Sequence, residues 1–84
     1  MGKREVIIAD VSRKYETPVA ELVQVACQFR STLFLNTKTH KINAKSIMGV
    51  MAFNPTEGMK VEVTAEGEDE TAALDAVENF LLCR

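Results

Sequence analysis

The residue of this chain whose type and position best suit a chemical role is Ser46, within residues 43–51 (NAKSIMGVM). Four apolar residues with helical spacing follow it: Ile47, Met48, Val50 and Met51. A serine in this position can cap a helix by accepting a hydrogen bond from a backbone N–H group. The same helix end would favour a phosphoryl group on Ser46. Two interpretations follow: a capped helix over a core, or a switch beside a surface patch of Ile47, Met48 and Met51.

The other reactive side chains do not form a catalytic or metal-binding pattern. Cys27 and Cys83 lie far apart in the sequence and match no metal-ligand spacing, so we expect free thiols without a catalytic role. His40 is the single histidine and falls in a polar segment that predicts an exposed turn. The sequence therefore predicts no metal, no cofactor and no enzyme activity.

The composition is typical of one small globular domain, which we expect to span residues 1–84. Hydrophobic residues make up 46% of the chain and charged residues 26%. A net charge of -2, no tryptophan and one tyrosine offer neither a basic field nor a stacking platform, so direct binding to nucleic acid is not expected. No apolar run approaches the roughly 20 residues of a membrane span. Since the N-terminus also lacks a signal-peptide pattern, we expect a cytoplasmic protein without membrane contact.

Hydrophobic periodicity predicts four strands. A β-branched apolar run at residues 6–9 predicts a well-buried strand. Thr32–Asn36 and Lys41–Asn43 flank a polar turn and predict a hairpin. Lys60–Glu66 alternates apolar and polar residues, so one face of that strand should meet the core and the other should meet water.

The segments between these strands predict three helices and a loop. Thr17 as N-cap followed by Pro18 is typical of a helix start, and that helix should run to about residue 28. Its apolar face is formed by Val19, Leu22, Val23, Ala26 and Phe29. The short helix after Ser46 should end before Pro55. Acidic residues 68–70 favour the start of the last helix. Its buried stripe is Ala73, Leu74, Val77 and Leu81.

The polar residues 10–16 predict a loop. The resulting order, β-α-β-β-α-β-α, predicts an α+β fold: a two-layer open-faced sandwich with a sheet wet on one face and helices on the other.

The chain resembles the HPr family, the small phosphocarriers of the bacterial sugar phosphotransferase system. The resemblance rests on residues 43–51, on residues 65–70 (AEGEDE) and on the apolar positions of the helix that begins at Pro18. It covers nearly the whole chain without an evident gap. It implies a four-stranded antiparallel sheet with three helices on one face, which agrees with the order predicted above.

The resemblance also implies two sites. In the family, a histidine in the pattern G-[LIV]-H-A-R-P accepts phosphate from enzyme I and passes it to sugar permeases. Aligned on Pro18, Tyr15 stands at the position of that histidine and Thr17 at the position of the arginine. A second family site is a serine that opens the short helix and is phosphorylated by HPr kinase/phosphorylase. Ser46 stands at its position.

The changes before Pro18 predict that phosphocarrier activity is lost. A tyrosine hydroxyl is neutral at pH 7 and a poor nucleophile without an activating base, and its phosphate ester would be too stable to pass on. Thr17 cannot supply the forked donor of an arginine, and Glu16 adds negative charge where a phosphoryl group would arrive. This pattern is similar to the Crh-like branch of the family, the catabolite-repression HPr homologues, which lack the histidine and keep the serine.

The resemblance therefore predicts a regulatory protein of carbon catabolite repression. HPr kinase/phosphorylase would phosphorylate Ser46, and the phosphoprotein would bind a LacI-type regulator such as catabolite control protein A as its corepressor. The expected docking surface consists of Ile47, Met48 and Met51, flanked by Thr17, Ala20 and Gln24. Two alternatives stay open: a residual phosphocarrier, and a constitutive interaction module in which Ser46 is only a helix cap.

Overall fold

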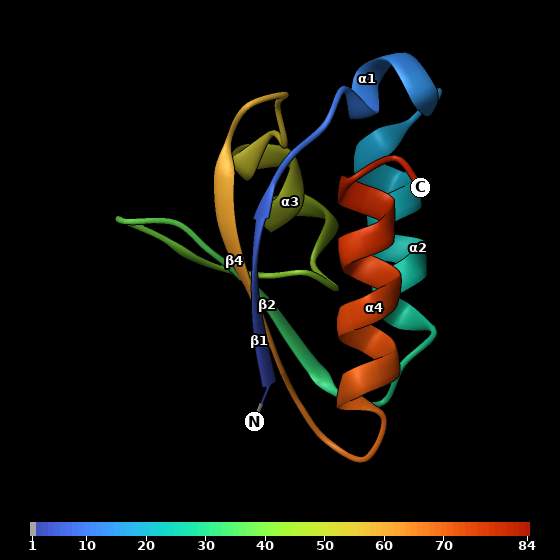
Figure 1. The fold of residues 1–84 in the computed structure, drawn as a ribbon, viewed down its shortest axis with the longest axis vertical. Coiled ribbons are helices and arrows are strands. Elements are labelled where there is room, and N and C mark those ends of the chain that lie inside the picture. The colour runs from blue at the N-terminus through green and yellow to red at the C-terminus, as the bar shows by residue number, and fades with distance from the viewer. Residues whose placement is uncertain (1) are drawn as a thin grey trace.

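The computed structural model describes residues 2–84 as a four-stranded sheet with helices packed on one face (Figure 1). The elements in chain order are β1 (Gly2–Ile7), α1 (Val11–Lys14), α2 (Pro18–Cys27), β2 (Thr32–Asn36), β3 (Lys41–Asn43), α3 (Ile47–Phe53), β4 (Lys60–Glu66) and α4 (Glu70–Leu81). The strands lie in the order β1-β4-β2-β3, and each neighbouring pair is antiparallel. The predicted α+β open-faced sandwich is confirmed.

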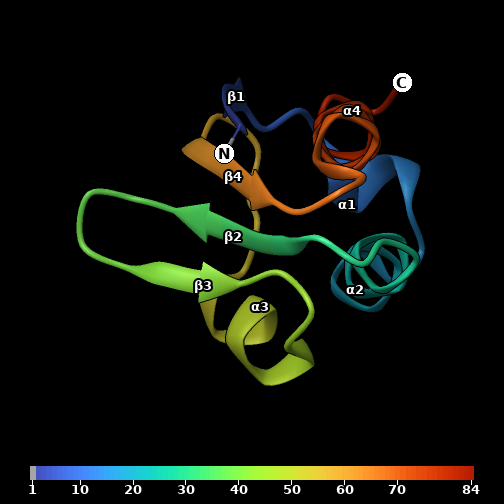
Figure 2. The same cartoon turned by 90° about the horizontal axis from the view of Figure 1, so that it is seen from below.

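The helices share one side of the sheet, and the core lies between the two layers (Figure 2). Helix α4 packs on β1 and β4, α2 packs beside α4, and α3 packs against α2 and β3. Along β4 the predicted alternation is confirmed, because Val61, Val63 and Ala65 are buried. Burying a side chain the size of valine stabilises a fold by about 1.5–3 kcal/mol, so each inward position on β4 contributes substantially.

The first strand differs from the prediction of a well-buried run at residues 6–9. It spans Gly2–Ile7, and although Val6 and Ile8 are buried, Ile7 is 62% exposed. The reason is the position of β1 at the edge of an open-faced sheet, where only alternate side chains face the helices. A β-branched run therefore did not indicate burial on both faces.

The segment 10–16, predicted as a loop, contains the one-turn helix α1. Its N-cap is Asp10, whose Oδ1 accepts a hydrogen bond from the backbone N–H of Arg13 at 3.2 Å. Val11 is buried and anchors the turn to the core. Four residues are too few to show helical periodicity, which is why the polar composition was misleading. The helix that follows ends at Cys27, one residue earlier than predicted, with Gln28 as its C-cap.

The turn that leads into α4 is fastened to the start of β2 by Asp69. Its carboxylate accepts hydrogen bonds from the backbone N–H groups of Arg30 and Ser31, both at 2.9 Å, and from the hydroxyl of Ser31. Gly67, with φ +152°, is required in this turn, because a Cβ there would lie 2.8 Å from the Cα of Ser31. The bonds to Ser31 and Arg30 lower the pKa of Asp69 to about 2.

Acid should therefore weaken this link. Because the pKa of folded Asp69 is about 2 and its ordinary value is 3.8, the stabilisation is complete above the ordinary value and is lost as the pH falls through about 2. We expect Asp69→Asn to lower the Tm at neutral pH and to show a shallower decrease of Tm in this acid range, measured by circular dichroism. Glu68→Gln, at an exposed neighbour, should keep the wild-type pH dependence. An Asp69→Asn variant with the full wild-type acid dependence would contradict the assignment.

Candidate functional site

Ser46 caps helix α3, as the sequence predicts. Its backbone is extended (φ -96°, ψ 112°), and its Oγ accepts a hydrogen bond from the N–H of Gly49 at 3.2 Å. The carbonyl of Ser46 also accepts the hydrogen bond of Val50 at 2.9 Å, the first of the helix. The cap satisfies one of the N–H groups that a helix start leaves without an intrahelical partner. Ser46 is nevertheless only partly buried, so the residue is not enclosed in the core.

The loop before Ser46 is held from both sides. The side-chain oxygen of Asn43 accepts the N–H of Lys45 at 2.9 Å, and the carbonyl of Asn43 accepts the N–H of Ser46 at 3.0 Å. The Nζ of Lys45 donates to the carbonyl of Phe29, just after α2, at 2.7 Å. These bonds fix Ser46 relative to both β3 and α2.

Helix α3 presents an apolar surface next to this hydroxyl. Ile47, Met48 and Met51 are 48%, 79% and 60% exposed, whereas Val50 is buried. We call the three exposed side chains the α3 patch. No acidic residue lies in the first turn of the helix, so no carboxylate there would repel an added negative charge.

The three expected flanking residues lie on the neighbouring helix. Helix α2 packs against α3 (Figure 2), with Thr17 and Gln24 exposed and Ala20 partly buried. Thr17 is the N-cap of α2, as predicted, although its side chain accepts no capping hydrogen bond. Instead, the carboxylate of Glu21 accepts the backbone N–H of Thr17 at 3.0 Å. The Thr17 hydroxyl also donates to the same carboxylate oxygen, at 3.4 Å, so Glu21 holds the start of the helix through two hydrogen bonds.

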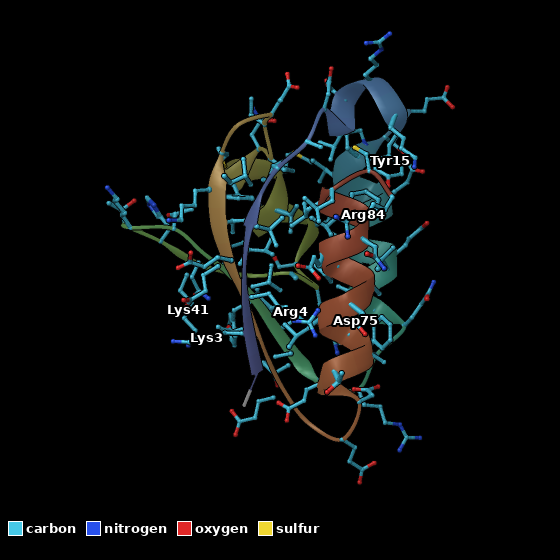
Figure 3. The ribbon with its side chains drawn as sticks, viewed as in Figure 1. Lys3, Arg4, Tyr15, Lys41, Asp75 and Arg84 are labelled. Carbon is cyan, nitrogen blue, oxygen red and sulfur yellow. The ribbon has the colours of Figure 1, made fainter. Side chains whose placement is uncertain are left out.

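Tyr15 is packed against the C-terminal end of α4 (Figure 3). Its ring stacks on that of Phe80, with centroids 4.1 Å apart and planes 5° apart, and its hydroxyl donates to the carbonyl of Phe80 at 3.2 Å. Lys14 lies beside the ring, with Nζ 5.8 Å from the centroid, and donates to the carbonyl of Cys83 at 2.7 Å. This arrangement was not predicted, because the partners are 65 residues or more apart and no local pattern joins them.

The environment of Tyr15 raises the pKa of its phenol above the ordinary value of 10.0. Burial is the main cause, and electrostatic interactions with Cys83 and Glu21 add to it. The phenol is therefore neutral at physiological pH. As a neutral hydroxyl engaged with a carbonyl, it has no activating base to make it a nucleophile.

The remaining candidate groups are placed as follows. His40 is exposed in the turn between β2 and β3, as predicted, with Nδ1 2.7 Å from the hydroxyl of Thr39. Cys27 is exposed and Cys83 partly buried, and both are free thiols. Among residues 2–84, no group of three or more His, Cys, Asp or Glu side chains could hold a metal ion. None of the helices described for these residues is long and apolar enough to cross a membrane.

The fold places this protein among the small open-faced α+β sandwiches. Comparison with known proteins identifies its family. Residues 3–82 match the family described as PTS HPr component phosphorylation site. The phosphocarrier protein HPr of Treponema pallidum is 49% identical over 63 residues, which cover 75% of this chain and 72% of the relative. The HPr-like protein Crh of Bacillus subtilis is 42% identical over 64 residues, which cover 76% and 75%. The crystal structure of HPr-C-His from Thermoanaerobacter tengcongensis has a TM-score of 0.87 at 33% identity, covering 96% of this chain and 91% of that one.

The chain therefore belongs to the HPr family of the bacterial phosphotransferase system. Proteins of this family are not themselves enzymes, and they act by interacting with phosphotransferase or regulatory proteins. Family membership also identifies the chain as a soluble cytoplasmic protein.

The stacking of Tyr15 can be tested through its titration, because this is the single tyrosine and the chain has no tryptophan. We expect the phenolate absorbance of the folded protein to rise with a midpoint above pH 10, and that of the denatured protein to have a midpoint near 10.0. Since the folded pKa is the higher one, stability should be full below pH 10 and should decrease as the pH rises through the folded value.

Two variants control this titration. Phe80→Leu removes the stacked ring and should bring the midpoint closer to that of the denatured chain, and Tyr15→Phe should abolish the signal. Equal midpoints for the folded and denatured wild-type protein would show that Tyr15 is solvated in solution.

Proposed function

We propose that this HPr-family protein is a regulator in carbon catabolite repression. In this proposal HPr kinase/phosphorylase phosphorylates Ser46, and the phosphoprotein binds a LacI-type transcription regulator such as catabolite control protein A as its corepressor. The observation that carries the proposal is the juxtaposition of a partly exposed serine with the α3 patch. One surface thus combines a modifiable group and apolar contact area.

The chemistry of this surface suits a switch. A phosphoryl group would add a charge of about -1.5 to -2 at Ser46, together with oxygen acceptors for an arginine or lysine of the partner. The first turn of α3 carries no acidic side chain that would oppose this charge. The exposed Met48 and Met51 supply flexible, polarisable apolar contacts that adapt to a partner's surface. Thr17, Ala20 and Gln24 on α2 would extend the contact.

The environment of Tyr15 supports a member of the family that has lost the catalytic histidine. Aligned on Pro18, Tyr15 would stand at the position of the family's phosphohistidine, and its hydroxyl donates to the carbonyl of Phe80. Phosphotransfer would need a nucleophile there, and a neutral phenol is a poor one. His40 offers no substitute, since the β2–β3 turn that carries it projects away from the C-terminal end of α4 (Figure 1). The relationship to the Bacillus subtilis Crh protein is consistent with this branch of the family.

Phosphorylation of Ser46 can be measured directly. We expect incubation with HPr kinase/phosphorylase and ATP to add one phosphoryl group, detected by intact-mass spectrometry, and we expect Ser46→Ala to abolish the gain. The phosphorylated protein should then bind the purified regulator with an affinity at least about tenfold above that of the unmodified protein, the effect of roughly one strong charge-assisted contact. No serine-dependent mass gain would refute the proposal.

A matched variant separates modification from folding. Ser46→Ala also removes the helix cap, which should lower the free energy of unfolding by about 1 kcal/mol. Ser46→Asn keeps a capping side chain but has no hydroxyl to phosphorylate, so it should retain stability and still fail to gain phosphate.

The capping bond from Gly49 to Ser46 supports an alternative, a constitutive interaction module in which Ser46 has only a structural role. This module would bind its partner equally well before and after treatment with the kinase. Ser46→Asn would then bind the partner as tightly as the kinase-treated wild-type protein. The regulatory proposal instead requires the kinase-treated variant to bind only as weakly as the unmodified wild-type protein.

A residual phosphocarrier is a second alternative, supported by relatives such as the Treponema pallidum HPr. We expect phosphoenolpyruvate and enzyme I to leave no acid-labile phosphate on this protein, because Tyr15 is no substitute for an imidazole. The measurement is phosphate incorporation before and after mild acid, with an authentic HPr as the positive control. Labelling at the level of that control would establish carrier activity and exclude the loss proposed here.

A further inference from the structure

A groove lies where α3 faces the β2–β3 hairpin and the start of β4. Its volume is about 660 Å³, which is within the usual range for small-molecule sites. Its apolar lining consists of Ile42, Gly49, Ala52, Phe53 and Met59. Three of these, Ile42, Phe53 and Met59, are partly buried and packed against the core, so this wall is fixed by the fold.

The titratable side chains that line the groove are all basic or neutral. Lys38 and His40 come from the hairpin, Lys60 comes from β4, and no lining residue is acidic. Lys60 pairs with Glu5, whose Oε2 lies 3.5 Å from the Nζ of Lys60. Both side chains are about two-thirds exposed, so this pair is weak and leaves the charge of Lys60 largely available. Threonines 37 and 39 add hydroxyl groups to the same rim.

We propose that this groove binds a small amphipathic organic anion, a carboxylate with an aromatic or branched aliphatic body. The apolar wall of Ile42, Phe53 and Met59 would contact the body, and Lys38 and Lys60 would attract the carboxylate. Charge complementarity selects an anion over a cation or a neutral compound. The volume of the groove is that of a small-molecule site. A stable protein interface would have to extend well beyond the residues that line it.

The groove shares one residue with the Ser46 site. Gly49 lines the groove, and its N–H group donates to the Oγ of Ser46 at 3.2 Å. A Cβ at Gly49 would lie 3.3 Å from Ile42 and 3.4 Å from the Oγ of Ser46, so the helix fits closely between the two sites. Occupation of the groove should therefore be detected at the Gly49 amide, in the protein with an unmodified Ser46.

The test is a titration of the isotope-labelled protein with 2-naphthoate, followed by NMR. We expect saturable shifts of Ile42, Gly49, Phe53 and Met59, and a markedly smaller affinity for the neutral isostere 2-naphthalenemethanol. Ala52→Leu places a larger side chain in the groove and should weaken binding about tenfold, since it displaces apolar contact with the ligand. Ala72→Leu is the matched control, because Ala72 is exposed on α4 and does not line the groove.

A second pair of variants tests the charge without altering the packing. Lys38→Gln should weaken 2-naphthoate binding about threefold, as expected for an exposed charge pair, and should leave the neutral isostere unaffected. Lys3→Gln, on the exposed face of β1, should leave both unchanged. The proposal is overturned by a lack of saturable shifts, by equal binding of the acid and the alcohol, or by equal effects of Ala52→Leu and Ala72→Leu. Concentration-dependent shifts of these residues without ligand would assign the groove to a second copy of the chain instead.

Discussion

The burial of one face of α4 against β1 and β4 is the interaction on which the other features depend. Five side chains of this helix are buried: Ala73, Leu74, Val77, Phe80 and Leu81. An open-faced sheet has only one side on which to build a core, so the longest helix must cover its central and edge strands. The helix is fixed at its start by Asp69, along its length by the pairing of Arg4 with Asp75 and Glu78 (Figure 3), and at its end by the contacts of Tyr15 and Lys14.

The two sites implied by the family resemblance differ in how far their side chains are used in packing. Tyr15 uses its ring and hydroxyl for packing against α4, so it is part of the structural framework. Ser46 is only partly buried and uses its hydroxyl for a single capping bond. This difference is the physical basis of the proposal that α3 carries the regulatory site. The short helix also separates the exposed patch from the groove on its other side.

Much of the fold and part of the site could be predicted from sequence. Alternation along Lys60–Glu66, the apolar spacing after Pro18 and after Glu70, and a serine ahead of Ile47 each depend on residues close together in the chain, where pattern reflects local geometry. The exposure of Ile47, Met48 and Met51 agrees with the predicted patch. Predictions were wrong where local pattern was too short or too simple. Examples are the one-turn helix after Asp10 and the edge strand β1.

The sequence by itself determined the order of elements, the inward face of each long element and the capping serine, because these follow from periodicity and from the chemistry of helix ends. The family resemblance, also read from sequence, was confirmed by comparison with known proteins. Only the tertiary structure decided the environment of Tyr15, the link from Asp69 to Ser31, and the groove beneath α3. Each of these joins residues that are distant in the chain, and the packing of helices on the sheet brings them together.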